Sequence, residues 1–293
     1  MASVTSSPRR EACPRLVPIL ALGSIIEPLA HPKPGAVTRL LPQADKDVFD
    51  FALHSAAVSS ALLASCEASA SGEPDPVAEG LRAYRLALAS LGLTRNVGLG
   101  QALITVPLAA ALPISGPRPE EIARAATGIA LRSTREASAE YYRLLRLLSP
   151  GHLGRYRGPL PDVGSGEPGL GLGELLRAVR WDLVASEVTG GYPVTLRALN
   201  LIVIEGGVGD RQVAEALTLV LAGAGDTLIA RRWGLRAYLA SRAEVIVYAG
   251  LHGAHKAMEL LDRPWRARGW SPGAALDVVA AAIGLYLVSR AYR

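Results

Sequence analysis

The sequence predicts an all-α fold, a single compact array of roughly ten helices. Helix start and stop signals recur along the 293 residues, whereas strand patterns are almost absent. Half of the residues are apolar, but only 2 are Phe and 9 are Tyr, so the core must consist of Ala, Leu, Val and Ile. Side chains of this size favour closely packed helices, and no internal repeat divides the chain.

The first helix is expected to follow a short polar tail. Residues 1–12 are predicted to be flexible, and residues 13–293 to form one all-α domain. The apolar run 16–29 superficially suggests a signal sequence, but prolines and Glu27 interrupt it and no convincing cleavage site follows. We therefore interpret this run as the first helix.

A stiff loop ends that helix. The segment EPLAHPKPGAVTR (27–39) places Lys33 between two prolines and two residues before Gly35. Proline fixes φ and removes a backbone donor, whereas glycine adopts conformations closed to other residues and lets a ligand come close. The segment therefore predicts either a rigid loop that presents Lys33 to a ligand or a plain interhelical turn with a solvated lysine.

Clear start signals mark two helices in the middle of the chain. Asp75 before Pro76 is a cap followed by a first-turn proline, which predicts a helix over 75–91. A second helix is predicted over 119–148, because acids occupy its first turn and arginines lie near its end, as the helix dipole prefers. The Gly- and Pro-rich segment at about 150–173 is then an exposed loop, a mobile linker or a lid over a site.

The last part of the chain is again helical. One long helix is predicted over 235–261, and Ser271 followed by Pro272 is expected to cap the final helix. Three further apolar runs occupy residues 103–112, 213–224 and 274–288. Each is shorter than the roughly 20 residues that a bilayer requires, so no membrane association is expected.

Charge and cysteine content indicate a cytoplasmic protein that handles anions. The formal net charge is +5, but the arginines are scattered among acids and alanines, without the concentrated basic stripe of a nucleic-acid-binding protein. Cys13 and Cys66 are the only cysteines, and two lone thiols make neither a disulfide framework nor a metal motif. This pattern is typical of the reducing cytoplasm.

Five sequence blocks in register resemble the triphosphoribosyl-dephospho-CoA synthase family. The first is similar to the family's E-x-x-x-x-PKPG-x-V block and lies at residues 27–37. The others are NVG with LITVPLAAA (96–111), WDLVASEV with YP (181–193), DTLIARRWG (226–234) and SPGAALD (271–277). The resemblance covers nearly the whole chain and implies a cytoplasmic transferase with a helical fold.

The chain also departs from the family pattern. It lacks the G-x-H-x-DM and His-Lys-Gly segments of the citrate-lyase and malonate-decarboxylase branch, and it looks more like the divergent, largely archaeal branch. In the last block Ser271, Ala274 and Ala275 stand where the family has Asn and two Thr, which removes polar groups. Asp277 of that block is an acid in an otherwise apolar helix, and Lys33 or an arginine is its expected partner.

The resemblance implies a transfer reaction on ATP. The 2′-hydroxyl of 3′-dephospho-CoA attacks ribose C1 of ATP, adenine leaves and the triphosphate stays intact, which gives 2′-(5″-triphosphoribosyl)-3′-dephospho-CoA. The transition state of such a glycosyl transfer has oxocarbenium character, so carboxylates near the sugar stabilise it or accept the hydroxyl proton. Guanidinium groups, a lysine and Mg²⁺ held by one or two carboxylates neutralise the phosphates. This chemistry needs no Walker loop or dinucleotide fingerprint, and the chain has neither.

The matched blocks supply candidate site residues. The phosphate- and substrate-binding candidates are Lys33, Arg39, Asn96, Arg231 and Arg232. The catalytic candidates are Asp182, Glu187 and Asp226, of which Glu187 and Asp226 are also the expected Mg²⁺ ligands, with Glu27 as a fourth carboxylate. On an ideal helix Asp182 and Glu187 lie about 140° apart, as do Asp226 and Arg231, so one member of each pair is expected to point elsewhere. Asp226 alternatively suits a helix N-cap, because it follows Gly225.

A histidine pair outside these blocks is a second candidate metal site. His252, His255 and Glu259 fall on one helical stripe, which is compatible with a metal ion. Gly253 and Ala254 favour close helix packing at the same place instead.

Two other functions stay open from sequence alone. The protein could transfer the same sugar to a different acceptor, which the missing His-containing segments favour. A noncatalytic nucleotide-binding or scaffold protein is the other alternative, and it predicts that the candidate residues are dispersed or engaged in ordinary surface ion pairs.

Overall fold

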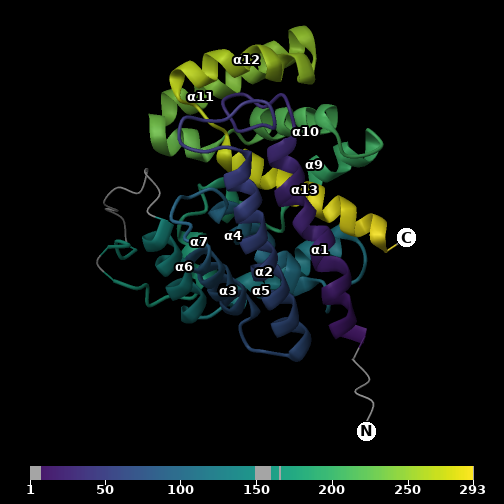
Figure 1. Cartoon of the computed structure of the whole chain (residues 1–293), viewed down its shortest axis with the longest axis vertical. Helices are drawn as coiled ribbons and strands as arrows, with labels where there is room; N and C mark the ends of the chain where they lie inside the picture. The colour runs from purple at the N-terminus through teal and green to yellow at the C-terminus, as the bar shows by residue number, and fades with distance from the viewer. Residues whose placement is uncertain (1–7, 149–159, 165, 293) are drawn as a thin grey trace.

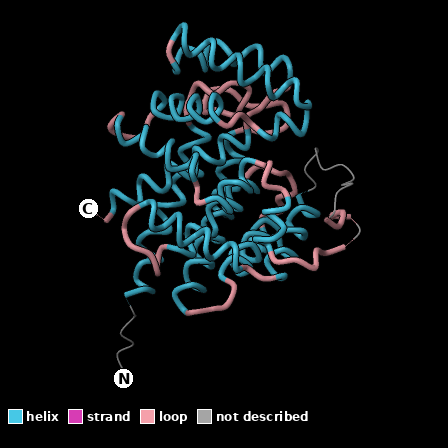
Figure 2. Tube along the Cα trace, turned by 180° about the vertical axis from the view of Figure 1, so that it is seen from behind, coloured by secondary structure: helices cyan, strands magenta, loops and turns pink. Residues whose placement is uncertain are grey.

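Helices are the regular elements of the computed structural model, which describes residues 8–148, 160–164 and 166–292 (Figures 1 and 2). These residues form thirteen helices and no strand, so the all-α prediction is confirmed and the count of about ten is too low. The helices of the first half are α1 (Pro8–Leu29), α2 (Val48–Ser71), α3 (Pro76–Ser90), α4 (Leu99–Ala111), α5 (Pro119–Arg132) and α6 (Arg135–Leu148). Those of the second half are α7 (Leu172–Ala178), α8 (Leu183–Gly190), α9 (Pro193–Ile204), α10 (Asp210–Gly223), α11 (Thr227–His252), α12 (Ala254–Arg268) and α13 (Gly273–Ala291).

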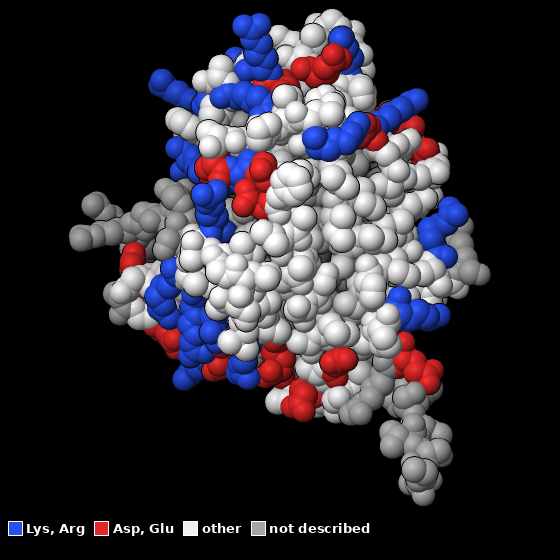
Figure 3. Space-filling view, in the orientation of Figure 1, with Lys and Arg blue, Asp and Glu red and all other residues white. Residues whose placement is uncertain are grey.

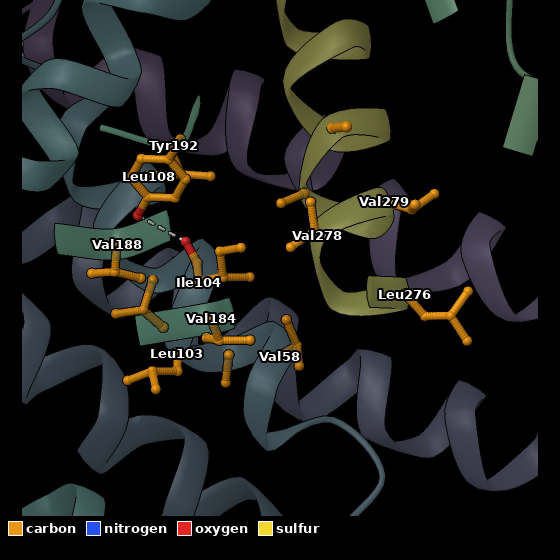
Figure 4. Close-up of a cluster of buried hydrophobic side chains, with 14 of the residues drawn as sticks. Val58, Leu103, Ile104, Leu108, Val184, Val188, Tyr192, Leu276, Val278 and Val279 are labelled. Carbon is orange, nitrogen blue, oxygen red and sulfur yellow. Dashed lines mark hydrogen bonds between the residues drawn. The ribbon is translucent and has the colours of Figure 1, made fainter. Parts of the chain in front are cut away.

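Helices α4 and α13 pass through the middle of the molecule (Figure 1). Every α4 residue from Gln101 to Ala111 is buried, and α4 packs against α2, α3, α5, α8 and α13. The core is mostly Ala, Leu, Val and Ile, as composition predicted. Figure 4 shows aliphatic side chains of α4, α8 and α13 filling the space between these helices. The hydroxyl of Tyr192 donates to the carbonyl oxygen of Ile104 at 3.0 Å, which satisfies a polar group within this core.

The backbones of α1 and α13 touch where the two helices cross. A Cβ atom added to Gly284 would lie 2.5 Å from the carbonyl oxygen of Leu20, and one added to Gly23 would overlap the carbonyl oxygen of Ala280. Only glycine, which has no Cβ, allows this approach. The contact therefore sets the position of α13 against α1.

The long helix predicted over 119–148 is divided into α5 and α6. Ser133 ends α5 in an extended conformation (φ −62°, ψ 146°). Asp75 holds the break, because its Oδ2 accepts from the backbone N–H and the hydroxyl of Thr134 at 2.6 and 2.7 Å. The Oδ1 atom of Asp75 accepts from the N–H of Ala78 at 3.0 Å, which confirms its predicted role as the cap of α3.

The C-terminal helices also differ from prediction. The helix predicted over 235–261 is interrupted at Gly253 (φ 78°), where α11 ends and α12 begins, and α11 itself is kinked at Gly234 (φ 83°). Glycine makes both conformations accessible without strain. The final helix begins after Pro272, as predicted, but Ser271 does not cap it; Gln43 Nε2 donates to the hydroxyl of Ser271 at 2.8 Å.

The N-terminal helix and the cysteines require two corrections. Residues 8–12 belong to α1 rather than to a flexible tail, whereas residues 1–7 lie outside the described part of the chain. Cys13 of α1 and Cys66 of α2 form a disulfide (S–S 2.09 Å, Cα–Cα 5.7 Å), so the interpretation as two lone thiols is wrong. Their separation of 53 residues forms no sequence motif, and helix packing alone brings them together. The disulfide removes the basis on which the cysteines predicted a cytoplasmic protein.

Three helices are long and apolar enough to cross a membrane, judged by length and composition: residues Glu11–Leu29 of α1, α2 and α13. A bent pair, α10 and α11, would add a fourth span. The expectation that the apolar runs are too short is therefore wrong for residues 274–288, which lie in the 19-residue α13, whereas residues 103–111 of the run 103–112 lie in α4, a shorter apolar helix. In α13, 72% of the apolar window is buried inside the protein, compared with 39% in α2. Charged side chains are correspondingly sparse over the face that α1 and α2 form (Figure 3).

Candidate functional site

A cavity of about 520 Å³ lies between α4, α6, α7, α8, α11, α13 and the segment after α1. Its volume is within the range of small-molecule sites, roughly 300–1,000 Å³. The lining has two parts of different character. The charged part contains Glu27, Lys33, Lys46, Asp182, Arg231, Arg232 and Asp277. The apolar part contains Tyr141, Tyr142, Leu145, Leu160, Val163, Leu175, Leu176 and Val179.

Lys33 lines the cavity but is paired and buried rather than free. Its ammonium donates to the carbonyl oxygen of Glu27 at 2.6 Å and to Glu27 Oε1 at 2.5 Å, and both side chains are almost fully buried. Burial lowers the pKa of Lys33 and raises the pKa of Glu27, while the attraction between the two groups opposes both shifts. Gln101 Nε2 adds a contact to Glu27 Oε2 at 3.4 Å. The pair therefore forms a rigid wall, and the lysine is less available to phosphate than the sequence predicted.

The rest of the PKPG loop packs against the protein. Gly35 has φ 67°, its N–H donates to Asp262 Oδ1 at 2.9 Å, and a Cβ there would overlap the carbonyl oxygen of Trp270. The glycine thus admits the chain's own backbone rather than a ligand. The alternative of a plain turn with a solvated lysine is also wrong, because Lys33 is only 1% exposed. Arg39 forms a bidentate ion pair with Asp210 at 2.6 Å for each bond and lies outside the cavity lining.

Four helices begin at the cavity. First-turn residues of α4, α8, α11 and α13 line it, and a helix N-terminus carries partial positive charge and unpaired N–H groups. Asp182 and Asp226 cap α8 and α11 with their side chains. The backbone N–H groups of Gly100 in α4 and Ala274 in α13 have no partner among the described residues. Two helix N-termini therefore offer donors to an anion in the cavity.

Asp182 connects the starts of α8 and α11. Its Oδ1 accepts from the N–H of Ala185 at 3.1 Å, and its Oδ2 from the hydroxyl of Thr227 and from Arg231 Nη2, both at 3.1 Å. The guanidinium of Arg231 lies over the ring of Trp181, 5.8 Å from its centroid. These contacts hold the side chains of Asp182, Arg231 and Trp181 in fixed positions at the cavity wall.

Glu187 and Asp226 are fully buried helix caps and do not line the cavity. Glu187 accepts from two N–H groups in the first turn of α9, at 3.0 and 2.6 Å. Asp226 accepts from Ile229 N–H at 2.9 Å and from Ala275 N–H at 2.8 Å, which joins the starts of α11 and α13. Burial raises the pKa of both carboxyls, that of Asp226 to about 6. In the pair Asp182 and Glu187, Glu187 points away from the cavity, and in the pair Asp226 and Arg231, Asp226 does. The alternative interpretation of Asp226 as a helix cap fits this geometry.

Three charged side chains of the cavity are not hydrogen-bonded or ion-paired to any described residue. Lys46, Arg232 and Asp277 line the cavity, and none of them forms a hydrogen bond or ion pair within the described part of the chain. Burial lowers the pKa of Lys46, and the nearby Arg232 acts in the same direction. The expected pairing of Asp277 with Lys33 is wrong, because Lys33 is taken by Glu27. Unpaired charges at a cavity are available to a ligand.

The apolar part of the cavity lies between α6, α7 and residues 160–163. The hydroxyl of Tyr142 donates to the carbonyl oxygen of Pro161 at 2.8 Å, which attaches this segment to α6. Burial raises the pKa of Tyr141 to about 12, so its hydroxyl is neutral at ordinary pH. Of the Gly- and Pro-rich segment predicted as a loop or lid, residues 149–159 and 165 lie outside the described residues.

Asn96 lines the cavity, and its Oδ1 accepts from the N–H of Leu99 at 3.3 Å at the start of α4. Sequence reasoning missed Lys46, because it lies in none of the matched blocks. One signal was present, since lysine occurs only at positions 33, 46 and 256 in a chain whose positive charge is otherwise arginine.

The histidine stripe does not form a metal site. His252 ends α11 and His255 belongs to α12, because Gly253 interrupts the helix that the stripe requires. Glu259 pairs with Lys256 at 2.9 Å. Within the described ranges, no three His, Cys, Asp or Glu side chains lie close enough together to hold a metal ion.

Comparisons with known proteins identify a family and a similar fold. Residues 13–293 match the CitG family, which is described as ATP:dephospho-CoA triphosphoribosyl transferase. A solved structure from Archaeoglobus fulgidus, described as "putative triphosphoribosyl-dephospho-coA synthase", is similar to this chain with a TM-score of 0.59 and 18% sequence identity. The similarity covers 80% of this chain and 97% of that one, and at this identity it supports the fold alone. No curated protein matches the chain.

Proposed function

Because the chain belongs to the ATP:dephospho-CoA triphosphoribosyl transferase family, we propose that its cavity binds ATP and 3′-dephospho-CoA and transfers the triphosphoribosyl group to the 2′-hydroxyl, with release of adenine. The observation that carries the proposal is the extent of the family match. It spans residues 13–293, so every residue that lines the cavity lies within it.

The charged part of the cavity suits the triphosphate. Lys46 and Arg232 are cations there that pair with no described residue, and Arg231 also presents a guanidinium to the cavity. The free N–H groups of Gly100 and Ala274 add donors at two helix N-termini. We therefore assign phosphate binding to these groups rather than to Lys33 and Arg39.

The ribose of ATP belongs between the charged and apolar parts. Positive charge develops at ribose C1 as adenine leaves, and the carboxylates of Glu27 and Asp182 supply negative potential at the same cavity. Their partners hold both groups in place, which is the property that electrostatic stabilisation requires. Asp182 thus keeps its predicted place at the site, whereas Glu187 and Asp226 support the scaffold.

The apolar part suits the uncharged portions of the substrates. Its aromatic and aliphatic side chains offer flat, dry contacts for adenine or for the pantetheine arm of dephospho-CoA. The side chain of Trp181 is 58% exposed, and the guanidinium of Arg231 lies over its ring. This ring offers a surface on which a base can stack.

The expected Mg²⁺ ligands do not fit that role. Both carboxylate oxygens of Glu187 and of Asp226 accept from backbone N–H groups, and neither residue lines the cavity. No step proposed for this site is therefore routed through a metal. Mg²⁺ stays a prediction for the ATP complex, in which phosphate oxygens provide most ligands.

A cytoplasmic location is also a proposal. Its support is the family reaction, which uses ATP and dephospho-CoA. The buried Cys13–Cys66 disulfide is the observation against it.

The direct test incubates the protein with ATP, Mg²⁺ and 3′-dephospho-CoA and measures free adenine by chromatography. We expect adenine release that depends on dephospho-CoA. Release without that dependence would indicate C1 chemistry with a different acceptor, and no release would leave a binding role.

A pair of variants tests the assignment of the phosphate site. Arg232→Met removes an unpaired cavity cation, so the KM for ATP should rise at least tenfold. Arg236→Met is the matched control, because Arg236 is an exposed α11 residue outside the cavity lining. An equal KM in the two variants would refute the assignment.

A further inference from the structure

Asp277 differs from every other acid near the charged part of the cavity. Glu27 is bound by Lys33, Asp182 by Arg231 and two further donors, and Asp226 by two backbone N–H groups. Asp277 lines the cavity and accepts no hydrogen bond from any described residue. A partly buried carboxylate without a donor costs stability, so its retention in an apolar helix calls for a role.

The position of this carboxylate is constrained by α4. A Cβ atom added to Gly100 would overlap Asp277 Oδ2 and lie 2.7 Å from its Cγ. Gly100, in the first turn of α4, therefore leaves the space in which the carboxylate sits. Both residues line the cavity, so the carboxylate is held at the cavity wall.

The charges around Asp277 favour a group that exchanges protons. Burial raises its pKa well above the ordinary value, and the carboxyls of Glu27, Asp226 and Asp182 act in the same direction. Lys46 opposes the shift. A base with a raised pKa holds a proton more readily than an ordinary aspartate, which suits transfer from an alcohol.

We propose that Asp277 is the catalytic base that takes the proton of the acceptor 2′-hydroxyl, an inference that rests on the proposed function. As the acceptor oxygen forms its bond to ribose C1, the O–H bond breaks and the proton moves to an Asp277 oxygen. The bond from C1 to adenine N9 breaks, and its electron pair leaves with adenine. Adenine takes up one proton from solvent and Asp277 releases its proton to solvent, so the reaction balances and the carboxylate is regenerated.

The other acids fit this role less well. Taking a proton at Glu27 would break its pair with Lys33 and leave a buried cation, and Asp182 would have to give up Arg231. Asp226 and Glu187 do not line the cavity. Asp277 alone among these five carboxylates changes its protonation without losing a partner.

The central experiment compares Asp277→Asn with the wild-type protein in the adenine-release assay. The amide has nearly the same shape but cannot accept the proton, so kcat should fall by about 10²–10⁴-fold. The KM for ATP should change by less than about threefold, and the thermal midpoint should not fall. Glu67→Gln is the charge-matched control, because Glu67 is exposed on α2 away from the cavity lining.

Two further measurements separate catalysis from folding. Gly100→Ala keeps the carboxylate but displaces it, so kcat should fall while the purified protein keeps a cooperative unfolding transition. In the wild type, kcat/KM should decline as the solution is acidified through the raised pKa of Asp277, and the Asn variant should lose this acid limb of the pH profile.

The titratable and charged groups near Asp277 are Glu27 on α1, Lys46 after α1, Tyr84 on α3, Asp182 before α8, Asp226 before α11 and Arg232 on α11.

The outcomes distinguish this inference from the proposed function. If the wild type releases adenine only with dephospho-CoA and Asp277→Asn keeps that rate, the assignment of the base is wrong and the proposed function stands. An acid limb that persists unchanged in the Asn variant has the same meaning. If the wild type releases no adenine, the proposed function fails and the assignment falls with it.

Discussion

Gly23→Ala is expected to destabilise the protein and to slow its reaction, although alanine is the better helix former. Gly23 lies in α1, where its missing side chain admits the backbone of α13. An added methyl group would lie 3.0 Å from the backbone nitrogen of Gly284 and would overlap the carbonyl oxygen of Ala280. Both neighbours are backbone atoms of one helix, so the clash can be relieved only by moving α13 or α1.

The magnitude follows from two opposing terms. Overpacking of this kind costs about 1–3 kcal/mol, and contact with backbone atoms places it near the upper limit. Replacing glycine by alanine within a helix raises the unfolding free energy by about 1 kcal/mol. The net loss of unfolding free energy is therefore about 2 kcal/mol, which lowers the thermal midpoint by roughly 3 °C for a chain of 293 residues.

A second glycine provides the matched control. Gly250 lies in α11, and a Cβ atom added there meets no heavy atom within 4 Å. Gly250→Ala should therefore raise the unfolding free energy by roughly 0.5–1 kcal/mol. Differential scanning calorimetry measures both midpoints.

The same variant links packing to function. α1 carries Glu27 and α13 carries Asp277, so separating the helices displaces two cavity groups. The kcat for adenine release should fall in Gly23→Ala and stay at the wild-type value in Gly250→Ala. A Gly23→Ala protein as stable as Gly250→Ala would refute the reasoning.

Three other predictions concern groups whose roles the structure reassigns. Asp226→Ala leaves two buried N–H groups without an acceptor, so calorimetry should show a loss of about 2–4 kcal/mol while kcat stays within about tenfold. The pKa of Asp226 is about 6 in the folded protein, so the folded state holds more protons than the unfolded state between pH 4 and 6. Unfolding free energy should therefore fall by roughly 3 kcal/mol as pH rises through that window, and urea titrations of Asp226→Asn should lack this decrease. Arg39→Met removes a surface ion pair with Asp210 outside the cavity, so the thermal midpoint should change by less than about 3 °C and the KM for ATP should stay unchanged; a tenfold rise would restore Arg39 to the phosphate site.

Helix type was predictable from the sequence because composition, caps and apolar spacing are local signals. The cap at Asp75 and the start of the last helix after Pro272 needed only neighbouring residues. The break at Ser133 was not predictable, because the same Asp75 holds it from 59 residues away. Long-range contacts of this kind leave no periodic trace in the chain.

The candidate site was predictable only in part, for a related reason. Sequence blocks identified Asp182, Arg231 and Arg232, which do line the cavity. The same blocks contain Glu187 and Asp226, whose carboxylates cap helices instead. The sequence does not distinguish an acid that caps a helix from an acid that contacts a substrate. The positions of the neighbouring backbone N–H groups show which role a carboxylate has.

If the cavity binds the triphosphate as proposed, the arrangement explains how an all-α protein would hold it without a glycine-rich loop. A P-loop gathers several backbone N–H groups in one turn, whereas here the starts of α4, α8, α11 and α13 meet at one cavity. Asp182 and Asp226 neutralise two of these N-termini from the protein side. The other two, with Lys46 and Arg232, keep their positive potential for the ligand. In the proposed complex, the helix starts that carry an acidic cap would repel the phosphates, and the two that carry none would attract them.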